Sequence, residues 1–394
     1  MGRSLAALAA IALAMVLFIP AALAPREFAG DEAAKISESY YFGLPPDHPD
    51  WFRSAIERTN PPVGKYAFGA AIVAAGRDLP PDPEIAWRPA EQRYVPPPGR
   101  ERLFRAAATP ARVVSAVTMS IVFGLVVWLT WGWGGPAAAC IAVLLLWRHF
   151  LTMTLGSLAT FDALQTLLIL AAVAILAPLR DASATQREWM IRAVASGALI
   201  GLAFQTRLNG VLALVPALLL ILAATSAVRR TRVLAATVLL LSCGFVTIAV
   251  NPFYWTPYIF ERVRWQLRDV DAVLGTLASS IRTETLGEKL QFFFSVIGSG
   301  VAGKAILAGV ALSLVALWRR RSPHLVTALL AGGSLAVVFA LWLPVRWERY
   351  VFPSLPLLVC AAALGWAAIF DYVVDRLRSS SRDRISSATK RSHV

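Results

Sequence analysis

The chain has 394 residues, of which 57% are hydrophobic and 16% are charged, and its mean hydropathy is +0.61. A soluble domain of this length carries more charge and less apolar surface, so the composition excludes a soluble protein and predicts an integral membrane protein. The formal net charge of +14 argues little for nucleic-acid binding, because basic residues in a membrane protein sort first by side of the membrane.

The three cysteines lie in separate apolar segments, at Cys140, Cys243 and Cys360. Their wide spacing indicates neither a disulfide framework nor a zinc site. We expect all three to be packing residues.

The first long apolar segment runs from Leu5 to Ala24. It fits either a signal peptide that ends at the Ala22-Leu23-Ala24 pattern or a retained membrane helix. Pro25 follows this pattern directly, and signal peptidases tolerate proline poorly just after the cut. We therefore predict a retained transmembrane helix.

Further apolar windows of about 20 residues follow, the length that crosses a hydrocarbon layer about 30 Å thick. They lie at 113–131, 136–157, 161–178, 190–206, 209–226, 233–251, 292–318, 325–343 and 351–370. With the first helix they predict an all-α polytopic membrane protein of about ten transmembrane helices. Arg148 and His149 interrupt one window, so that helix is expected to end near Trp147 and the count is open by one.

Arginine clusters fall on one side of the membrane when ten helices are counted. These clusters are Arg180, Arg187 and Arg192; Arg229, Arg230 and Arg232; Arg319, Arg320 and Arg321; and the tail from Arg376 to Arg391. By the positive-inside rule this side is the cytoplasm, so both termini are predicted to be cytoplasmic and the protein to lie in the inner (cytoplasmic) membrane.

The same count makes residues 25–112 the first extracytoplasmic loop. Its basic residues are no objection, because loops longer than about 60 residues escape the rule. We expect residues 1–370 to form one transmembrane domain and residues 371–394 to form a basic cytoplasmic tail, disordered because it is rich in Ser and Arg.

Two features that mark many transporters are missing from the sequence. It has no visible internal repeat and no pair of Gly/Pro-broken spans at matching places in two halves. Titratable residues are scarce in the middle of the apolar segments, where ion-coupled carriers need them. Polar residues instead collect at the outer ends of the predicted helices.

Asp31 and Glu32 follow the first span by a few residues and are therefore expected at the outer membrane face. The stretch from Glu32 to Tyr41 lacks Gly and Pro and predicts a short interfacial helix with Ile36, Tyr40 and Tyr41 toward lipid. A carboxylate at this place can take the proton of an attacking hydroxyl within hydrogen-bonding reach. The alternative is that both acids only stabilise the N-terminus of the helix through its dipole.

A proline pair, Asn60-Pro61-Pro62, precedes the step Gly64-Lys65-Tyr66 in the same loop. The prolines fix the chain direction at the surface, and the following residues can dip into the interface. Lys65 is a candidate partner for a phosphate group. The alternative is a structural turn followed by a lysine that snorkels to the surface.

Asp162 lies in the first turn of a helix that is predicted to enter the membrane from outside, with Thr160 as its N-cap. Capping and the helix dipole alone can account for both residues. Asp162 is nevertheless expected at the same face as Asp31.

Arginines interrupt two apolar stretches at the outer face, at Arg207 with Asn209 and at Arg346 and Arg349 around Glu348. Guanidinium groups make bidentate contacts to phosphate oxygens, so such arginines suit a phosphorylated lipid. The alternative is snorkelling with aromatic anchors at Trp347 and Tyr350.

These motifs, taken in their order, resemble the GT-C superfamily of polyprenyl-phosphate-sugar glycosyltransferases. The resemblance is to the branch of the protein O-mannosyltransferases and the aminoarabinose transferases of lipid A. It rests on Asp31-Glu32 after the first span and on the segments NPPVGKY, SLATFDAL, GLAFQTRLNGVLALVPALLL and WERYVFPSLPLL. Together these touch most of the chain.

The resemblance implies a helix bundle whose first outer loop covers a cavity for a lipid-phosphate sugar donor. It implies that Asp31 is the general base that deprotonates an acceptor hydroxyl, with inversion at the sugar, and that Glu32 supports it or holds a divalent metal ion. The implied substrate-binding residues are Asn60, Lys65, Tyr66, Asp162, Arg207, Arg346 and Arg349. The implied partners are the donor, the bilayer and a glycan, lipid or protein acceptor, and no nucleic acid.

The sequence departs from the family at two points. We expect neither a large outer C-terminal domain nor a long inserted outer domain, and the histidine that often opens the Pro-Pro motif is Asn60. Two other functions stay open: a transporter or flippase of a lipid-linked sugar, and an O-antigen ligase or polymerase, which usually depends on a large late outer loop.

Overall fold

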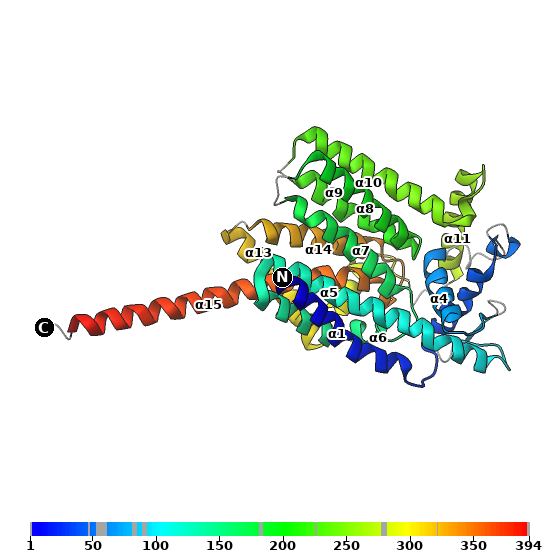
Figure 1. Cartoon of the computed structure of the whole chain (residues 1–394), viewed down its shortest axis with the longest axis horizontal. Coiled ribbons are helices and arrows are strands. Elements are labelled where there is room, and N and C mark those ends of the chain that lie inside the picture. The colour runs from blue at the N-terminus through cyan, green and yellow to red at the C-terminus, as the bar shows by residue number, and fades with distance from the viewer. Residues whose placement is uncertain are drawn as a thin grey trace.

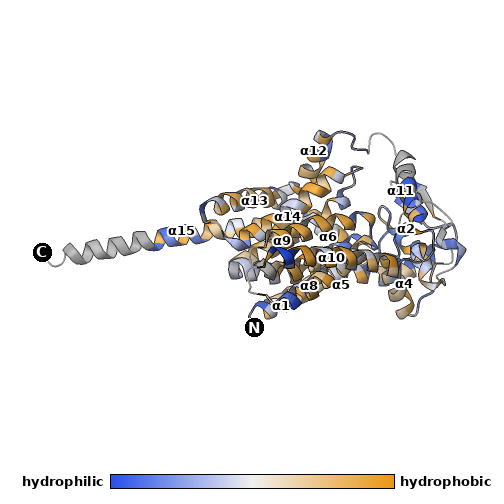
Figure 2. Ribbon diagram, turned by 90° about the horizontal axis from the view of Figure 1, so that it is seen from above, coloured by the Kyte–Doolittle hydropathy of each residue, from blue (hydrophilic) through white to orange (hydrophobic). Residues whose placement is uncertain are grey.

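The structure is a computed structural model that describes residues 2–45, 48–52, 61–80, 85–88, 93–180, 184–224, 227–276, 282–320 and 322–391. Long helices lie side by side in a bundle (Figure 1). α1 starts toward one end of this bundle and α15 projects beyond the same end, whereas α4 and α11 lie at the other end, which we call the loop end. Hydrophobic residues dominate the bundle, whereas α2 and α11 carry more hydrophilic ones (Figure 2).

The first part of the chain places a set of short elements between two long helices. These elements are α1 (Gly2–Leu23), α2 (Glu32–Ser37), η1 (Glu38–Gly43), η2 (Pro49–Phe52), α4 (Pro62–Ala74), the antiparallel strands β1 (Ala86–Arg88) and β2 (Arg93–Val95), and α5 (Glu101–Arg148).

The middle of the chain forms the next helices of the bundle, with short helical turns between them. They are α6 (Phe150–Leu155), α7 (Asp162–Leu176), η3 (Ala177–Arg180), α8 (Gln186–Phe204), η4 (Leu208–Ala213), α9 (Leu214–Ala223), α10 (Arg229–Val250) and η5 (Pro252–Tyr254).

The last part reaches the loop end at α11 and again at η7, and it closes the bundle. Its elements are α11 (Ile259–Thr276), α12 (Leu286–Ile297), α13 (Gly300–Arg320), α14 (Pro323–Trp342), η7 (Glu348–Tyr350), η8 (Phe352–Ser354) and α15 (Leu355–Arg391).

The predicted all-α membrane fold is confirmed. Among the described residues, six helical stretches are long and apolar enough to cross a membrane, and two shorter apolar helices accompany them. Each of the ten predicted spans overlaps a helix of the bundle. The number of spans stays a prediction, because several of these helices are shorter than a bilayer requires.

Glycine positions explain where the helix boundaries differ from the predicted spans. Gly135 has φ 75° and ψ −171°, which interrupts the helical backbone of α5 between two predicted spans. The span predicted at 292–318 is divided into α12 and α13 by a break between Gly298 and Gly300. The interrupted window at 136–157 ends at Arg148, close to the expected residue, and continues as the short helix α6.

Small residues allow close helix contacts, as is usual in membrane bundles. Gly197 and Gly201 of α8 face α10, and a Cβ atom at these positions would overlap the carbonyl oxygens of Leu239 and Cys243. Cys243 and Cys360 are buried as expected. Cys140 is exposed among the described residues, so its expected packing role is wrong.

A second apolar cluster lies at the loop end, separate from the core of the bundle, and we call it the loop core. It consists of Phe28, Ala33, Ile36, Phe68, Ile72, Phe104, Ala107, Ala108, Ala111, Ala159 and Phe161. The predicted exposure of Ile36 and Tyr41 to lipid is therefore wrong, since both are fully buried, and Tyr40 donates a hydrogen bond to Asp50 at 2.8 Å. Side chains from α4 and α5 cover these residues in place of lipid.

The C-terminal segment also differs from its prediction. The last helix, α15, continues to Arg391 through the residues that we expected to be disordered. This segment has no Gly or Pro after Gly365, so no helix-breaking residue interrupts it.

Candidate active site

Asp31 lies at the loop end, immediately after a turn that its neighbour makes possible. Gly30 has φ +53°, a left-handed conformation that glycine adopts without steric cost. The backbone N–H of Tyr94 in β2 donates to the carbonyl of Gly30 at 2.8 Å, and α2 begins at the next residue after Asp31. The turn therefore fixes the carboxylate between the end of α1 and the strand pair.

Two arginines from distant parts of the chain face the Asp31 carboxylate. Arg349 of η7 forms a direct ion pair with it, and Arg207, which precedes η4, lies 3.9 Å away. Asp31 makes no capping hydrogen bond to α2. Its side chain is 15% exposed, so a small ligand group can reach it.

The charges around Asp31 control its protonation. Burial alone would raise the pKa of this carboxyl group, but Arg349, Lys35 and Arg207 outweigh that effect and hold the pKa well below its usual range. The same negative charge helps burial to raise the pKa of the neighbouring Tyr94 hydroxyl. Asp31 is therefore a carboxylate at any physiological pH.

Asp162 continues this row of charges. It is fully buried in the first turn of α7 and lies 2.9 Å from Arg207, which thus bridges Asp31 and Asp162. The predicted N-cap at Thr160 is wrong: Phe161 occupies the cap position and makes no capping bond, and the chain turns into the helix one residue later than expected. Asn209 accepts a hydrogen bond from Gln165 at 2.7 Å and so ties η4 to α7 behind the arginine.

Glu32 occupies a different environment from its neighbour. Its fully buried carboxylate accepts two hydrogen bonds from Arg112, at 2.7 and 2.8 Å. It also accepts hydrogen bonds from the backbone N–H groups of Ala159 at 2.9 Å and Ala29 at 3.3 Å. Glu32 therefore joins the start of α2 to α5 and to the loop before α7.

A metal ion does not fit at Glu32, where the sequence made one possible. Both carboxylate oxygens are already used by a guanidinium and by two N–H groups, and a cation such as Arg112 in bidentate contact excludes a second cation from the same oxygens. Within the described residues, no group of three or more His, Cys, Asp or Glu side chains is arranged to hold a metal.

Lys65 and Tyr66 of α4 form an aromatic region beside this site. Lys65 is 1% exposed, and its ammonium lies 4.2 Å from the ring centre of Tyr41 and 5.7 Å from that of Trp51. Burial raises the pKa of the Tyr66 hydroxyl to about 12. Lys65 is therefore held among aromatic rings, and a phosphate contact by it stays a prediction. Asn60 lies outside the described residues.

The first turn of α4 is fitted against the start of α7. A Cβ atom at Gly64 would overlap the ring of Phe161. Phe68 packs on the same ring, with 5.0 Å between the two ring centres. Larger side chains at Gly64 would push α4 away from the residue that precedes Asp162.

Arg346 points elsewhere. Its side chain is 44% exposed and pairs with Glu288 of α12 at 3.9 Å. The structure thus brings Asp31, Asp162, Arg207 and Arg349 together and leaves Arg346 at the periphery.

Sequence reasoning missed two charged residues of the site. Lys35 follows Asp31 by four residues, a spacing that places both on one side of a helical turn, and it pairs with Glu38 at 2.7 Å. Arg112 stands at the outer end of the span predicted at 113–131, a position like that of Arg207, and this signal in the sequence could have identified it.

The comparisons with known proteins identify the fold. No protein-family model matches the chain, and no curated protein matches it significantly. Among solved structures, it is similar to ArnT from Cupriavidus metallidurans bound to undecaprenyl phosphate, with 19% identity and a TM-score of 0.57 over 91% of this chain. It is also similar to the archaeal oligosaccharyltransferase AglB from Archaeoglobus fulgidus in complex with an inhibitory peptide and a dolichol-phosphate, with 14% identity and a TM-score of 0.55 over 95% of this chain. Both neighbours are GT-C glycosyltransferases.

The chain has the GT-C fold. The resemblance predicted from the sequence is confirmed at this level. The match covers 59% of the ArnT chain and 52% of the AglB chain, so this protein shares their membrane bundle and spans little more than half of their length.

Proposed function

We propose that this GT-C protein is a membrane glycosyltransferase that moves a sugar from a polyprenyl-phosphate donor to an acceptor hydroxyl. The observation that carries the proposal is the Asp31 carboxylate set between Arg349 and Arg207 at the loop end of the bundle. An anionic base next to two cations is the arrangement that a hydroxyl nucleophile and a phosphate leaving group require.

In the proposed reaction, Asp31 takes the proton of the acceptor hydroxyl as its oxygen attacks the anomeric carbon of the sugar. The bond from that carbon to the phosphate oxygen breaks on the opposite face, which inverts the configuration. The sugar leaves on the acceptor, and polyprenyl phosphate leaves with an additional negative charge. Arg349 and Arg207 stabilise this charge as it develops, because preplaced cations act most strongly in a water-poor site.

The same arginines explain how a carboxylate with a low pKa acts as a base. Without a donor, Arg349 and Arg207 neutralise Asp31. A donor phosphate competes for their N–H groups, which weakens their hold on Asp31 and raises its pKa toward the range that suits proton transfer. Asp162 keeps Arg207 in place during this exchange, since it holds the same guanidinium at 2.9 Å.

The proposal includes a location. The loop end, with Asp31, faces outward from the inner membrane, and the start of α1 and the end of α15 face the cytoplasm. Support comes from the arginine clusters near 187–192 and 229–232, which follow the positive-inside rule. The lipid phosphates bound by ArnT and AglB support a donor of the same class.

The test is conversion of a defined donor. Purified full-length protein in vesicles is incubated with undecaprenyl-phosphate mannose, glucose, arabinose or aminoarabinose, each radiolabelled in the sugar, together with an envelope extract as the source of acceptors. A transferase releases undecaprenyl phosphate and moves label into the extract. Movement of an intact donor across the vesicle membrane, with no release from any of the four sugars, would instead support a flippase.

A further inference from the structure

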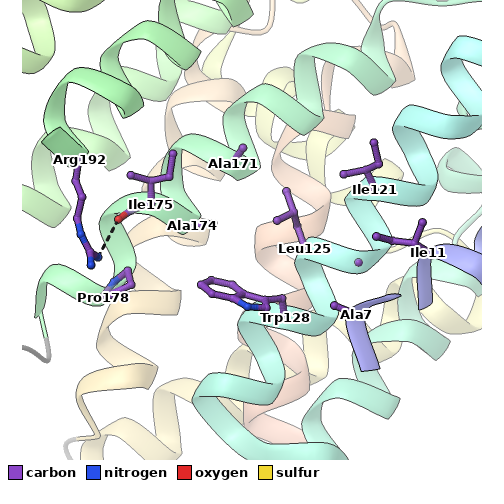
Figure 3. Close-up of a pocket in the computed structure, with 11 residues that line it drawn as sticks. Ala7, Ile11, Ile121, Leu125, Trp128, Ala171, Ala174, Ile175, Pro178 and Arg192 are labelled. Carbon is purple, nitrogen blue, oxygen red and sulfur yellow. Dashed lines mark hydrogen bonds between the residues drawn. The ribbon is translucent and has the colours of Figure 1, made fainter. Parts of the chain in front are cut away.

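A groove lies between α1, α5 and α7, and none of its lining residues belongs to the Asp31 site. Its volume is about 600 Å³, within the usual range of small-molecule sites. Ala7 and Ile11 of α1 line one side of the groove. Trp128 of α5 and Ala171 and Ile175 of α7 line the rest, and Arg192 of α8 lies at one end (Figure 3).

The groove is built to face hydrocarbon. Ten of its eleven lining residues are apolar, and Leu8 on α1 and Ile191 on α8, which flank it, are exposed on the outer surface of the bundle. An apolar trough of this kind in a bilayer is filled by an acyl or polyprenyl chain, because water finds no hydrogen-bond partners there.

One end of the groove is cationic. The Arg192 side chain extends from α8 toward Pro178, and one of its guanidinium nitrogens donates to the carbonyl of Ile175 at 3.3 Å (Figure 3). Arg3 stacks on the Trp128 ring, with its guanidinium carbon 3.4 Å from the ring centre. The exposed Glu188 carboxylate nearby accepts hydrogen bonds from the Thr185 N–H and hydroxyl groups through Oε2, and it also attracts Arg192 electrostatically.

The position of the groove along α1 indicates which leaflet supplies its lipid. Ile11 precedes the end of α1 at Leu23 by twelve residues, which is about 18 Å along the helix. Asp31 lies beyond that end. The groove residues therefore lie in the opposite half of the bundle from Asp31, and its arginines are not those that contact a donor phosphate in the proposed function.

We propose that this groove binds one anionic glycerophospholipid of the leaflet at the α1 start, with an acyl chain along α1 and α5 and its phosphate between Arg192 and Arg3. The two guanidinium groups complement the negative headgroup, and bound lipid fills the contact between α1 and the α7–α8 pair. This binding is independent of the proposed transferase reaction.

The experiment measures lipid binding to the purified full-length protein by native mass spectrometry. Delipidated protein is titrated with phosphatidylglycerol and, separately, with phosphatidylcholine of the same acyl chains. We expect one phosphatidylglycerol molecule to bind, more tightly than phosphatidylcholine. Arg192→Gln is expected to lower the affinity for phosphatidylglycerol about fivefold, the effect of one cation near a membrane surface. Arg192→Lys keeps most of the affinity.

Two further variants distinguish recognition of the headgroup from occupation of the groove by the acyl chain. Arg187→Gln changes an exposed arginine on the same helix outside the groove and leaves binding unchanged. Ala171→Phe fills the groove and removes the bound lipid, while the elution volume of the protein confirms that it is folded.

Three results would overturn the proposal: equal affinity for both lipids, unchanged phosphatidylglycerol binding in Arg192→Gln, or displacement of phosphatidylglycerol by undecaprenyl phosphate. The last result would assign the groove to a polyprenyl chain.

Discussion

Asp31 and Glu32 are adjacent acidic residues with opposite surroundings. Glu32 is fully buried and uses both oxygens on one arginine and two backbone N–H groups. Asp31 is partly exposed, and the contacts of its carboxylate within the described residues are ion pairs with the Arg349 and Arg207 side chains. Backbone contacts cannot move without unfolding the local structure, whereas arginine side chains can turn to a ligand. The difference supports a structural role for Glu32 and the proposed catalytic role for Asp31.

The largest expected effect comes from removing the charge of Asp31. Asp31→Asn is expected to lower the transfer rate by about 10²–10⁴-fold, the usual contribution of a general base, because an amide cannot accept the proton. The rate is measured as undecaprenyl phosphate released per minute. Glu27→Gln, at an exposed acid of the same loop that pairs with Arg93, serves as the control and keeps the wild-type rate.

For Glu32 we expect a loss of folding stability and not a direct loss of catalysis. Glu32→Gln leaves Arg112 buried without a counter-charge, which costs roughly 3–5 kcal/mol of folding stability. Thermal unfolding in detergent measures this loss, and Arg112→Gln is expected to match it. If Glu32→Gln unfolds at the wild-type temperature and yet fails to transfer sugar, the structural role that we assign to Glu32 is wrong.

A smaller effect is expected for Arg349, together with a change in pH dependence. In the proposed mechanism, Arg349→Gln removes a charge-assisted contact to the donor phosphate and is expected to lower the transfer rate by about 10–100-fold. It also removes the first charge that lowers the pKa of Asp31, so burial raises that pKa and the acidic limb of the rate profile moves to higher pH. Rates from pH 5 to pH 8 measure the shift.

The same substitution affects stability in a defined pH range. A lowered carboxyl pKa stabilises the fold above the unfolded value of about 3.9, and this stability is lost as pH falls through the folded pKa. Arg349→Gln is therefore expected to be less stable than wild type at neutral pH and to approach it below pH 4. A stability difference that is constant from pH 3 to pH 8 would mean that Asp31 is not its cause.

The smallest effect is expected for Arg346. Because its ion pair with Glu288 is exposed and 3.9 Å long, Arg346→Gln should change the transfer rate by less than about threefold. A loss as large as that of Arg349→Gln would show that Arg346 turns inward to the donor.

The sequence predicted the helix bundle and the grouping of acids and arginines at one end of it. Hydrophobic windows mark the spans, and the positions of Asp31, Asp162 and Arg207 at span ends follow directly from them. Glu32 could not be separated from Asp31, because the N–H group that locks it belongs to Ala159, 127 residues away. Local periodicity likewise placed Ile36 toward lipid, since the loop core that covers it comes from three distant segments.

The central claim is tested most directly by a single turnover with bound donor. Wild-type protein and Asp31→Asn are saturated with the labelled undecaprenyl-phosphate sugar that proves active, the retained donor is quantified, and acceptor extract is then added. We expect both proteins to hold equal amounts of donor and only the wild type to release undecaprenyl phosphate. Release by Asp31→Asn at the wild-type rate would contradict the account.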